Sequence, residues 1–83
     1  MRYSLLFTAD HADSASEWQL VNKLRGISSD GKWKFTDIED YTTVYSFDTT
    51  SEEAMVLALL GFEIRSVSSH EEAVAFYRSD LEI

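Results

Sequence analysis

Two short groups of acidic residues carry the side chains that could take part in chemistry. One is DHAD at positions 10–13, and the other is DIED at positions 37–40. A histidine beside several carboxylates can hold a divalent cation or move a proton. Neither group has the ligand spacing of a known metal loop such as an EF-hand, so a metal or proton-transfer site is the weaker interpretation. The six residues that could share one acidic rim are Asp10, His11, Asp13, Asp37, Glu39 and Asp40.

The favoured interpretation of this acidic rim is a hydrated binding surface. Acids are common in turns, and the helix dipole favours negative charge near helix N-termini. Like charges gathered at one end of a fold repel one another and gain nothing from the core. We therefore expect the rim to bind a protein partner with a basic surface, and we predict no metal and no catalytic residue in it.

The usual signatures of catalysis are missing from the sequence. There is no cysteine, which removes thiolate catalysis and thiolate metal sites. No serine lies in a G-x-S-x-G elbow, and the three glycines are isolated, so a glycine-rich phosphate loop is absent. The second histidine, His70, follows a helix N-cap and is expected to be solvated. The prediction is a protein that is not an enzyme and uses no cofactor.

Length and charge narrow the class of partner. The 83 residues predict a single domain over 1–83, and the net charge of −8 comes from 15 acids against 7 Lys and Arg. Phosphates and anionic lipid headgroups repel such a chain, so neither direct nucleic-acid binding nor membrane binding is expected. The longest apolar run, 54–60, is far shorter than a membrane span. The first ten residues lack the features of a signal peptide, and we expect a cytoplasmic protein.

Hydrophobic periodicity predicts seven elements in the order β-α-β-β-α-β-α. Residues alternate between apolar and polar in the predicted strands, and S/T-x-x-E capping boxes begin the helices. The first six elements match the βαββαβ plan of ferredoxin-like domains. The predicted fold class is α+β, a ferredoxin-like sandwich with a four-stranded antiparallel sheet, two helices on one face and an additional C-terminal helix. The expected strands span 2–9, 32–37, 41–48 and 62–68, and the expected helices span 14–27, 52–61 and 70–81.

Residue parity predicts the hairpin and one core face. Trp33, Phe35, Tyr45 and Phe47 are all odd-numbered, so the hairpin loop needs an odd number of residues to keep them on one face. A three-residue loop over 38–40 does this, and it sets Asp37 opposite Tyr41. The expected core face, covered by the first two helices, consists of Tyr3, Leu5, Phe7, Trp33, Phe35, Tyr45, Phe47, Phe62 and Ile64.

The plan also explains how the acidic rim could assemble. The first and second strands run parallel in a ferredoxin-like domain, so their C-terminal ends lie at the same end of the sheet. That arrangement brings 10–13 close to 37–40, whereas His70 is expected at the other end of the sheet.

Two apolar surfaces remain without an assigned partner. The opposite face of the sheet has a mildly apolar centre and no aromatic residue, which disfavours RNA stacking. The segment AMVLALL at 54–60 is apolar on every side, although a helix on a sheet normally keeps a polar face. The last helix either covers the open face or leaves it to another chain. Enclosure of the middle helix by that helix and nearby loops, and contact with a second copy or a partner, are both left open.

The leading function hypothesis is a small acidic protein that acts through protein–protein contacts. A sharper form makes it an inhibitor of a nucleic-acid-binding protein or enzyme, whose carboxylates mimic phosphates, as in proteins encoded by viruses and mobile elements. The alternative is a regulatory domain that binds a small ligand and works as a homodimer, which is a common use of this architecture.

Overall fold

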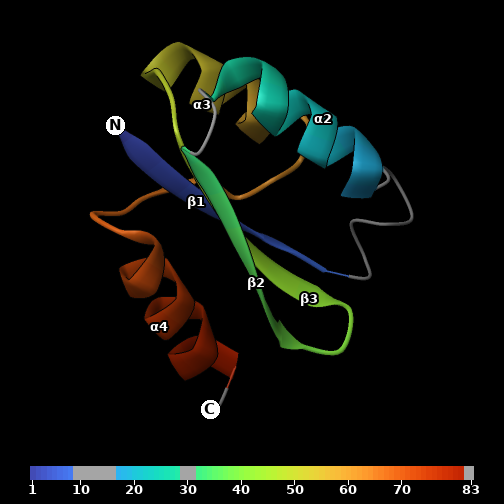
Figure 1. The fold of residues 1–83 in the computed structure, drawn as a ribbon, viewed down its shortest axis with the longest axis vertical. Coiled ribbons are helices and arrows are strands. Elements are labelled where there is room, and N and C mark those ends of the chain that lie inside the picture. The colour runs from blue at the N-terminus through green and yellow to red at the C-terminus, as the bar shows by residue number, and fades with distance from the viewer. Residues whose placement is uncertain (9–16, 29–31, 82–83) are drawn as a thin grey trace.

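The computed structural model describes residues 1–8, 17–28 and 32–81, and it has an α+β architecture (Figure 1). Within these residues, three helices and four strands follow one another in the order that the sequence periodicity predicts. The elements are β1 (Arg2–Phe7), α2 (Glu17–Ile27), β2 (Trp33–Glu39), β3 (Thr42–Asp48), α3 (Ser51–Leu59), β4 (Arg65–Ser66) and α4 (His70–Leu81).

The strands form one antiparallel sheet in the order β2-β3-β1-β4. β1 and β2 each pair antiparallel with β3, so they run parallel to one another. β4 is much shorter than expected, because only Arg65 and Ser66 pair with β1. Phe62 and Ile64, which were expected in that strand, still pack against the core from the segment that precedes it.

The β2–β3 hairpin keeps the predicted faces but reaches them differently. The three-residue loop over 38–40 is wrong, because β2 continues to Glu39 and only Asp40 and Tyr41 form the turn. The pairing passes from Asp37 opposite Thr43 to Glu39 opposite Thr42, so Ile38 is the extra residue of a β-bulge. The bulge supplies the odd residue that parity requires, and Asp37 faces Thr43 rather than Tyr41.

The first face of the sheet packs against α2 and α3, which lie together on one side of the sheet in Figure 1. Alternate strand residues on this face meet Leu20 and Leu24 of α2 and Ala54 and Leu57 of α3. Phe35 was expected in this core, but its side chain is 58% exposed. The helices therefore cover the centre of this face and leave its β2 edge open.

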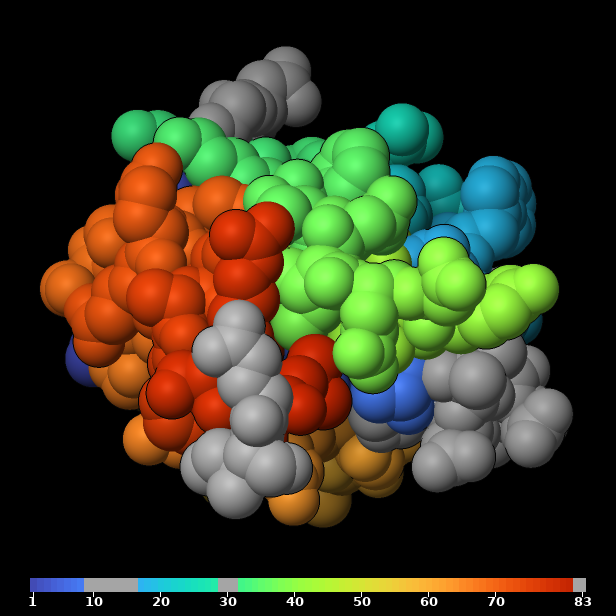
Figure 2. Space-filling view, turned by 90° about the horizontal axis from the view of Figure 1, so that it is seen from below, coloured from blue at the N-terminus to red at the C-terminus, as the bar shows by residue number. Residues whose placement is uncertain are grey.

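The second face of the sheet is covered by α4, which settles the open question about the last helix. Ala73 and Tyr77 of α4 pack against Val44 and Val67, with Leu6, Ile38 and Val74 at the margin. Figure 2 shows α4 beside the β2–β3 hairpin on one side of the molecule. Phe76 and Leu81 point outward, and the Arg65 guanidinium lies 3.8 Å from the centre of the Phe76 ring.

Two of the predicted capping boxes hold the starts of α3 and α4. The Glu53 amide donates to the Thr50 hydroxyl at 3.3 Å, and the Glu72 amide donates to the Ser69 hydroxyl at 3.1 Å. The Glu72 carboxylate accepts from the backbone amide and the hydroxyl of Ser68. α3 ends before Gly61, whose φ of 106° is a conformation that suits glycine. Within the described residues, no helix is both long enough and apolar enough to cross a membrane.

Candidate functional site

The structure describes only the residues of the acidic rim that come from segment 37–40. Asp37 and Glu39 lie in β2, and Asp40 lies in the turn that follows it. Asp10, His11 and Asp13 lie outside the described residues, so the predicted meeting of 10–13 with 37–40 stays a prediction.

The hairpin acids surround a shallow depression of about 460 Å³, which we call the acidic depression. Glu17, at the start of α2, adds a fourth carboxylate to it. The Asp37 carboxylate accepts a hydrogen bond from the Thr43 hydroxyl at 2.7 Å, which fixes its direction. The lining residues are Glu17, Asp37, Ile38, Glu39, Asp40, Tyr41 and Thr43, and none of them is basic. The four carboxylates therefore give the depression a negative charge that no basic lining residue neutralises.

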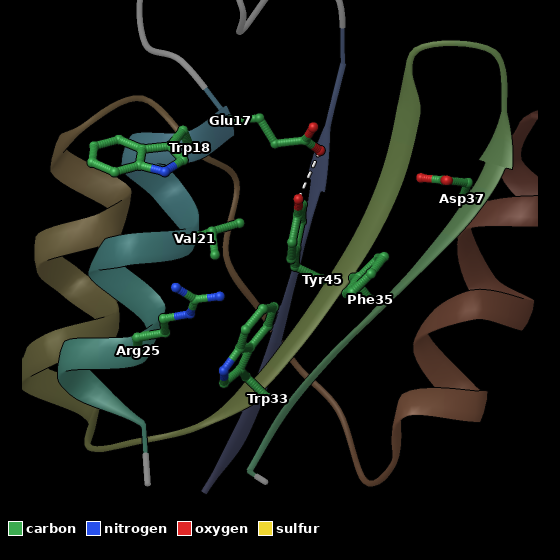
Figure 3. A pocket seen from close by; sticks show the side chains of 8 residues that line it. All are labelled: Glu17, Trp18, Val21, Arg25, Trp33, Phe35, Asp37 and Tyr45. Carbon is green, nitrogen blue, oxygen red and sulfur yellow. Dashed lines mark hydrogen bonds between the residues drawn. The ribbon is translucent and has the colours of Figure 1, made fainter. Parts of the chain in front are cut away.

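A second hollow of about 440 Å³, which we call the aromatic cleft, adjoins the acidic depression and shares Glu17 and Asp37 with it. α2 forms one wall and the first face of β2 and β3 forms the other (Figure 3). The cleft exists because α2 leaves the β2 edge of this face uncovered. Its lining residues are Glu17, Trp18, Val21, Arg25, Trp33, Phe35, Asp37 and Tyr45.

Three aromatic rings form a triangular cluster on the sheet wall of the cleft. The centroids of Trp33 and Phe35 are 6.1 Å apart, and the Tyr45 centroid lies 6.5 Å from Trp33 and 6.1 Å from Phe35. Neighbouring positions on one face of β2 and β3 produce this cluster, because Phe35 pairs with Tyr45 and Trp33 lies two residues before Phe35 on the same strand. Tyr45 is buried, Trp33 is half-buried and Phe35 is exposed, so the cluster is partly open to solvent.

The two ends of the cleft carry opposite charges. At one end the Tyr45 hydroxyl donates to the Glu17 carboxylate at 2.6 Å (Figure 3). Burial, together with this carboxylate, raises the pKa of Tyr45 far above its usual value, so the phenol stays a hydrogen-bond donor at neutral pH. At the other end the Arg25 guanidinium lies 6.0 Å from the centre of the Trp33 ring, at the outer limit of a cation–π contact.

Among the residues that the structure describes, no group of three or more His, Asp or Glu side chains is placed to hold a metal ion.

His70 is not the solvated residue that its position after a helix N-cap suggested. Its Nδ1 lies 2.6 Å from the Ser46 hydroxyl and its Nε2 lies 2.8 Å from the Thr36 hydroxyl. Burial lowers the pKa of His70, which keeps the ring neutral at pH 7. The Arg2 guanidinium also donates to the Ser46 oxygen at 3.1 Å. His70 therefore joins α4 to β2 and β3 and belongs to the fold.

The outer side of α3 is an exposed apolar surface. Ala54 and Leu57 face the core, whereas Met55 is 66% and Leu59 is 85% exposed, and Leu60 beyond the helix is exposed as well. Enclosure by the last helix is excluded, because α4 packs on the opposite face of the sheet.

Sequence reasoning missed the aromatic cleft, although a signal for it was present. Trp18, Val21 and Arg25 are spaced i, i+3 and i+7, so they share a stripe of α2 beside the stripe that enters the core. The S-x-x-E spacing from Ser14 to Glu17 predicts only a capping box for Glu17, and that pairing lies partly outside the described residues. A second amphipathic stripe next to the core stripe was the available sign of a lined cleft.

Comparison with known proteins assigns no family to this arrangement. No protein-family model matches the chain, and the searches of curated proteins and of solved structures find no match either.

Proposed function

We propose that this chain is a small acidic, non-enzymatic protein that binds a protein partner with a basic surface. The observation that carries the proposal is the continuity of the acidic depression with the aromatic cleft through Glu17 and Asp37. Carboxylates steer a basic partner toward the surface, and partly exposed aromatic rings supply apolar contact area once it arrives. Exposed rings of this kind at the site are those of Trp18, Phe35 and Tyr41.

A sharper form of the proposal is inhibition of a nucleic-acid-binding protein or enzyme by acidic mimicry. The carboxylates would occupy the partner's phosphate-binding groups, and the same charge keeps this chain away from nucleic acid and anionic membranes. We also infer a ferredoxin-like arrangement, which the strand order and the parallel course of β1 and β2 support. A cytoplasmic location is a separate part of the proposal.

The test is affinity purification with the full chain, followed by mass spectrometry and by binding measurements with the purified partner. We expect a basic nucleic-acid-binding protein whose association slows steeply as salt increases, since screening weakens charge steering. Nucleic acid added in excess should compete with the chain. A partner without a basic surface, or binding that is insensitive to salt, would contradict the proposal.

The exposed side of α3 favours a second candidate, a homodimeric regulatory domain that binds a small ligand. Met55 and Leu59 would be covered in such a dimer, because exposed apolar patches mark contact surfaces. Light scattering decides between the two candidates. A monomer that shows no thermal shift with a panel of metabolites would remove the regulatory domain.

A further inference from the structure

We propose that the aromatic cleft receives an arginine side chain of the protein partner, with its guanidinium group between Glu17 and Asp37. The inference rests on the proposed function, because it names the chemical group by which a basic partner would be held. It concerns the aromatic cleft, which shares Glu17 and Asp37 with the acidic depression but is not lined by Glu39 or Asp40.

The shape of the cleft fits a long side chain with a flat head. Its sheet wall is the cluster of Trp33, Tyr45 and Phe35, and its helix wall includes Val21. An arginine stem can cover apolar surface while the planar guanidinium stacks on an aromatic face. Phe35 is the most exposed ring of this cluster, so it is the ring most open to stacking by an incoming guanidinium.

The acceptors at the hairpin end are already oriented. Tyr45 donates to one oxygen of Glu17, and Thr43 donates to one oxygen of Asp37. A carboxylate has about four lone-pair sites, so each group can accept further donors from a guanidinium. Hydrogen bonds between a guanidinium and carboxylates are among the strongest that proteins form, and geometry fixed in advance reduces the entropy lost on binding.

Arg25 sets the direction in which the cleft is filled. Its guanidinium lies near Trp33 and repels a second cation from that end, so the incoming head is directed toward Glu17 and Asp37. The charged lining residues of the cleft are two carboxylates and one guanidinium, and the acidic depression adjoins the two carboxylates. The local field therefore favours a cation over an anion.

The probe is a capped peptide, Gly-Gly-Arg-Gly-Gly, titrated into the full chain. The sequence holds two tryptophans, and both Trp18 and Trp33 line the cleft, so intrinsic fluorescence reports on this site. The neutral control replaces arginine with citrulline, which keeps the shape and removes the charge. We expect the arginine peptide to bind roughly tenfold more tightly, because charge-assisted hydrogen bonds are lost in the control. No difference between the peptides up to about 10 mM, the weak limit for a single side chain, would overturn the inference.

Matched variants separate insertion into the cleft from general attraction. Glu17→Gln and Phe35→Ala should each weaken binding of the arginine peptide several-fold, and both side chains are exposed enough that folding is retained. Glu39→Gln removes the same charge from the acidic depression but lies outside the cleft, so it should change binding little. Equal weakening by Glu39→Gln and Glu17→Gln would mean diffuse attraction and would overturn the inference.

Arg25→Gln tests the charge of the occupant. We expect equal or tighter binding of the arginine peptide, because the variant removes a like charge. Weaker binding would show that the cleft takes an anionic or zwitterionic group. Agmatine, which carries the guanidinium of arginine without a peptide, tests whether the cleft binds a free small molecule. Saturation by agmatine but not by the peptide would show that the guanidinium does not come from a partner protein. If a basic partner binds the chain and Phe35→Ala leaves its affinity unchanged, the inference fails while the proposed function stands.

Discussion

The two faces of the sheet are closed in different ways. On the first face α2 and α3 form a large, mainly apolar core, yet they leave the β2 edge uncovered and the aromatic cleft open. On the second face a single helix, α4, covers a smaller core and adds polar contacts from His70 to Ser46 and Thr36. A large apolar core holds its helices without directional contacts, whereas hydrogen bonds help to fix the position of a helix on a small core.

This difference separates the surfaces that hold the fold from those that are free to bind. The polar contacts of the second face are used within the chain. The carboxylates of Glu17 and Asp37 on the first face each accept one internal hydrogen bond and still face solvent. Function is therefore expected at the open edge of the first face and not beneath α4.

Leu57→Ala should have the largest effect, because it removes the side chain that fixes α3 to the first face. Leu57 is fully buried, and truncation of a buried leucine costs about 2–5 kcal/mol of unfolding free energy. Leu59→Ala is the matched control on the exposed side of the same helix, where changes stay within about 0.5 kcal/mol. Urea unfolding measures both variants. Similar losses would show that the outer side of α3 is covered in solution, which would favour the homodimer.

His70→Ala should have the next largest effect, because it breaks the polar connection of the second face. Ser46 is fully buried, and its hydroxyl is a hydrogen-bond partner of both His70 Nδ1 and the Arg2 guanidinium. The variant removes the imidazole partner of this buried hydroxyl, at a cost of about 1–3 kcal/mol. Urea unfolding at pH 7.5 is the measurement. A loss as small as that of Leu59→Ala would mean that the apolar contacts alone hold α4.

The pH dependence of stability gives His70 a second, independent readout. The folded pKa lies below the usual 6.5 because of burial, with smaller effects of Lys34 and Arg2 in the same direction and of Glu71 against it. The unfolded chain therefore binds more protons, and stability falls as pH drops below about 6.5 toward the folded pKa. Between pH 7.5 and 5.5 the wild type should lose more stability than His70→Ala. An equal loss would assign the pH dependence to other groups.

Alternation and capping predicted the elements from the sequence because both are local. α4 was predicted over 70–81 and is observed as His70–Leu81, and the odd-numbered residues of β2 and β3 share a face as expected. The β-bulge at Ile38 was not predictable, since a bulge and a three-residue loop satisfy the same parity. The short β4 was missed because alternation in 62–68 reports burial of Phe62 and Ile64 and not strand pairing.

The site was less predictable than the fold, because it depends on where a helix lands on the sheet. Phe35 and Phe47 have the same parity, yet Phe47 is fully buried under the helices and Phe35 is not. His70 was missed for a similar reason, since a first-turn position says nothing about which strand the helix approaches. Turn chemistry placed Glu39 and Asp40 in the hairpin loop, but only Asp40 lies in the turn, because β2 continues to Glu39.

Glu72→Ala should weaken the start of α4. Its carboxylate accepts two hydrogen bonds from Ser68, and these bonds lower the pKa of Glu72. We expect the variant to lower the Tm by a few degrees and to lose this deficit as pH falls through the folded pKa, where the wild-type carboxylate becomes protonated. Glu71→Ala removes a neighbouring charge from the same turn without those bonds to Ser68. Equal lowering by the two variants would assign the effect to the helix dipole.

The combined variant Glu39→Gln and Asp40→Asn should have the smallest effect on stability, because both residues lie at the open end of the hairpin, beyond either core. They are exposed, and they share the acidic depression with Glu17 and Asp37, so removing two like charges reduces repulsion. We expect an unchanged or slightly higher Tm in a thermal melt.

With a basic partner, association should slow and its salt dependence should flatten, because charges outside the desolvated centre mainly steer encounter. Stopped-flow association at two ionic strengths measures this. A clear loss of Tm would mean that these acids hold the hairpin together, and unchanged association at low salt would move the binding surface to the exposed side of α3.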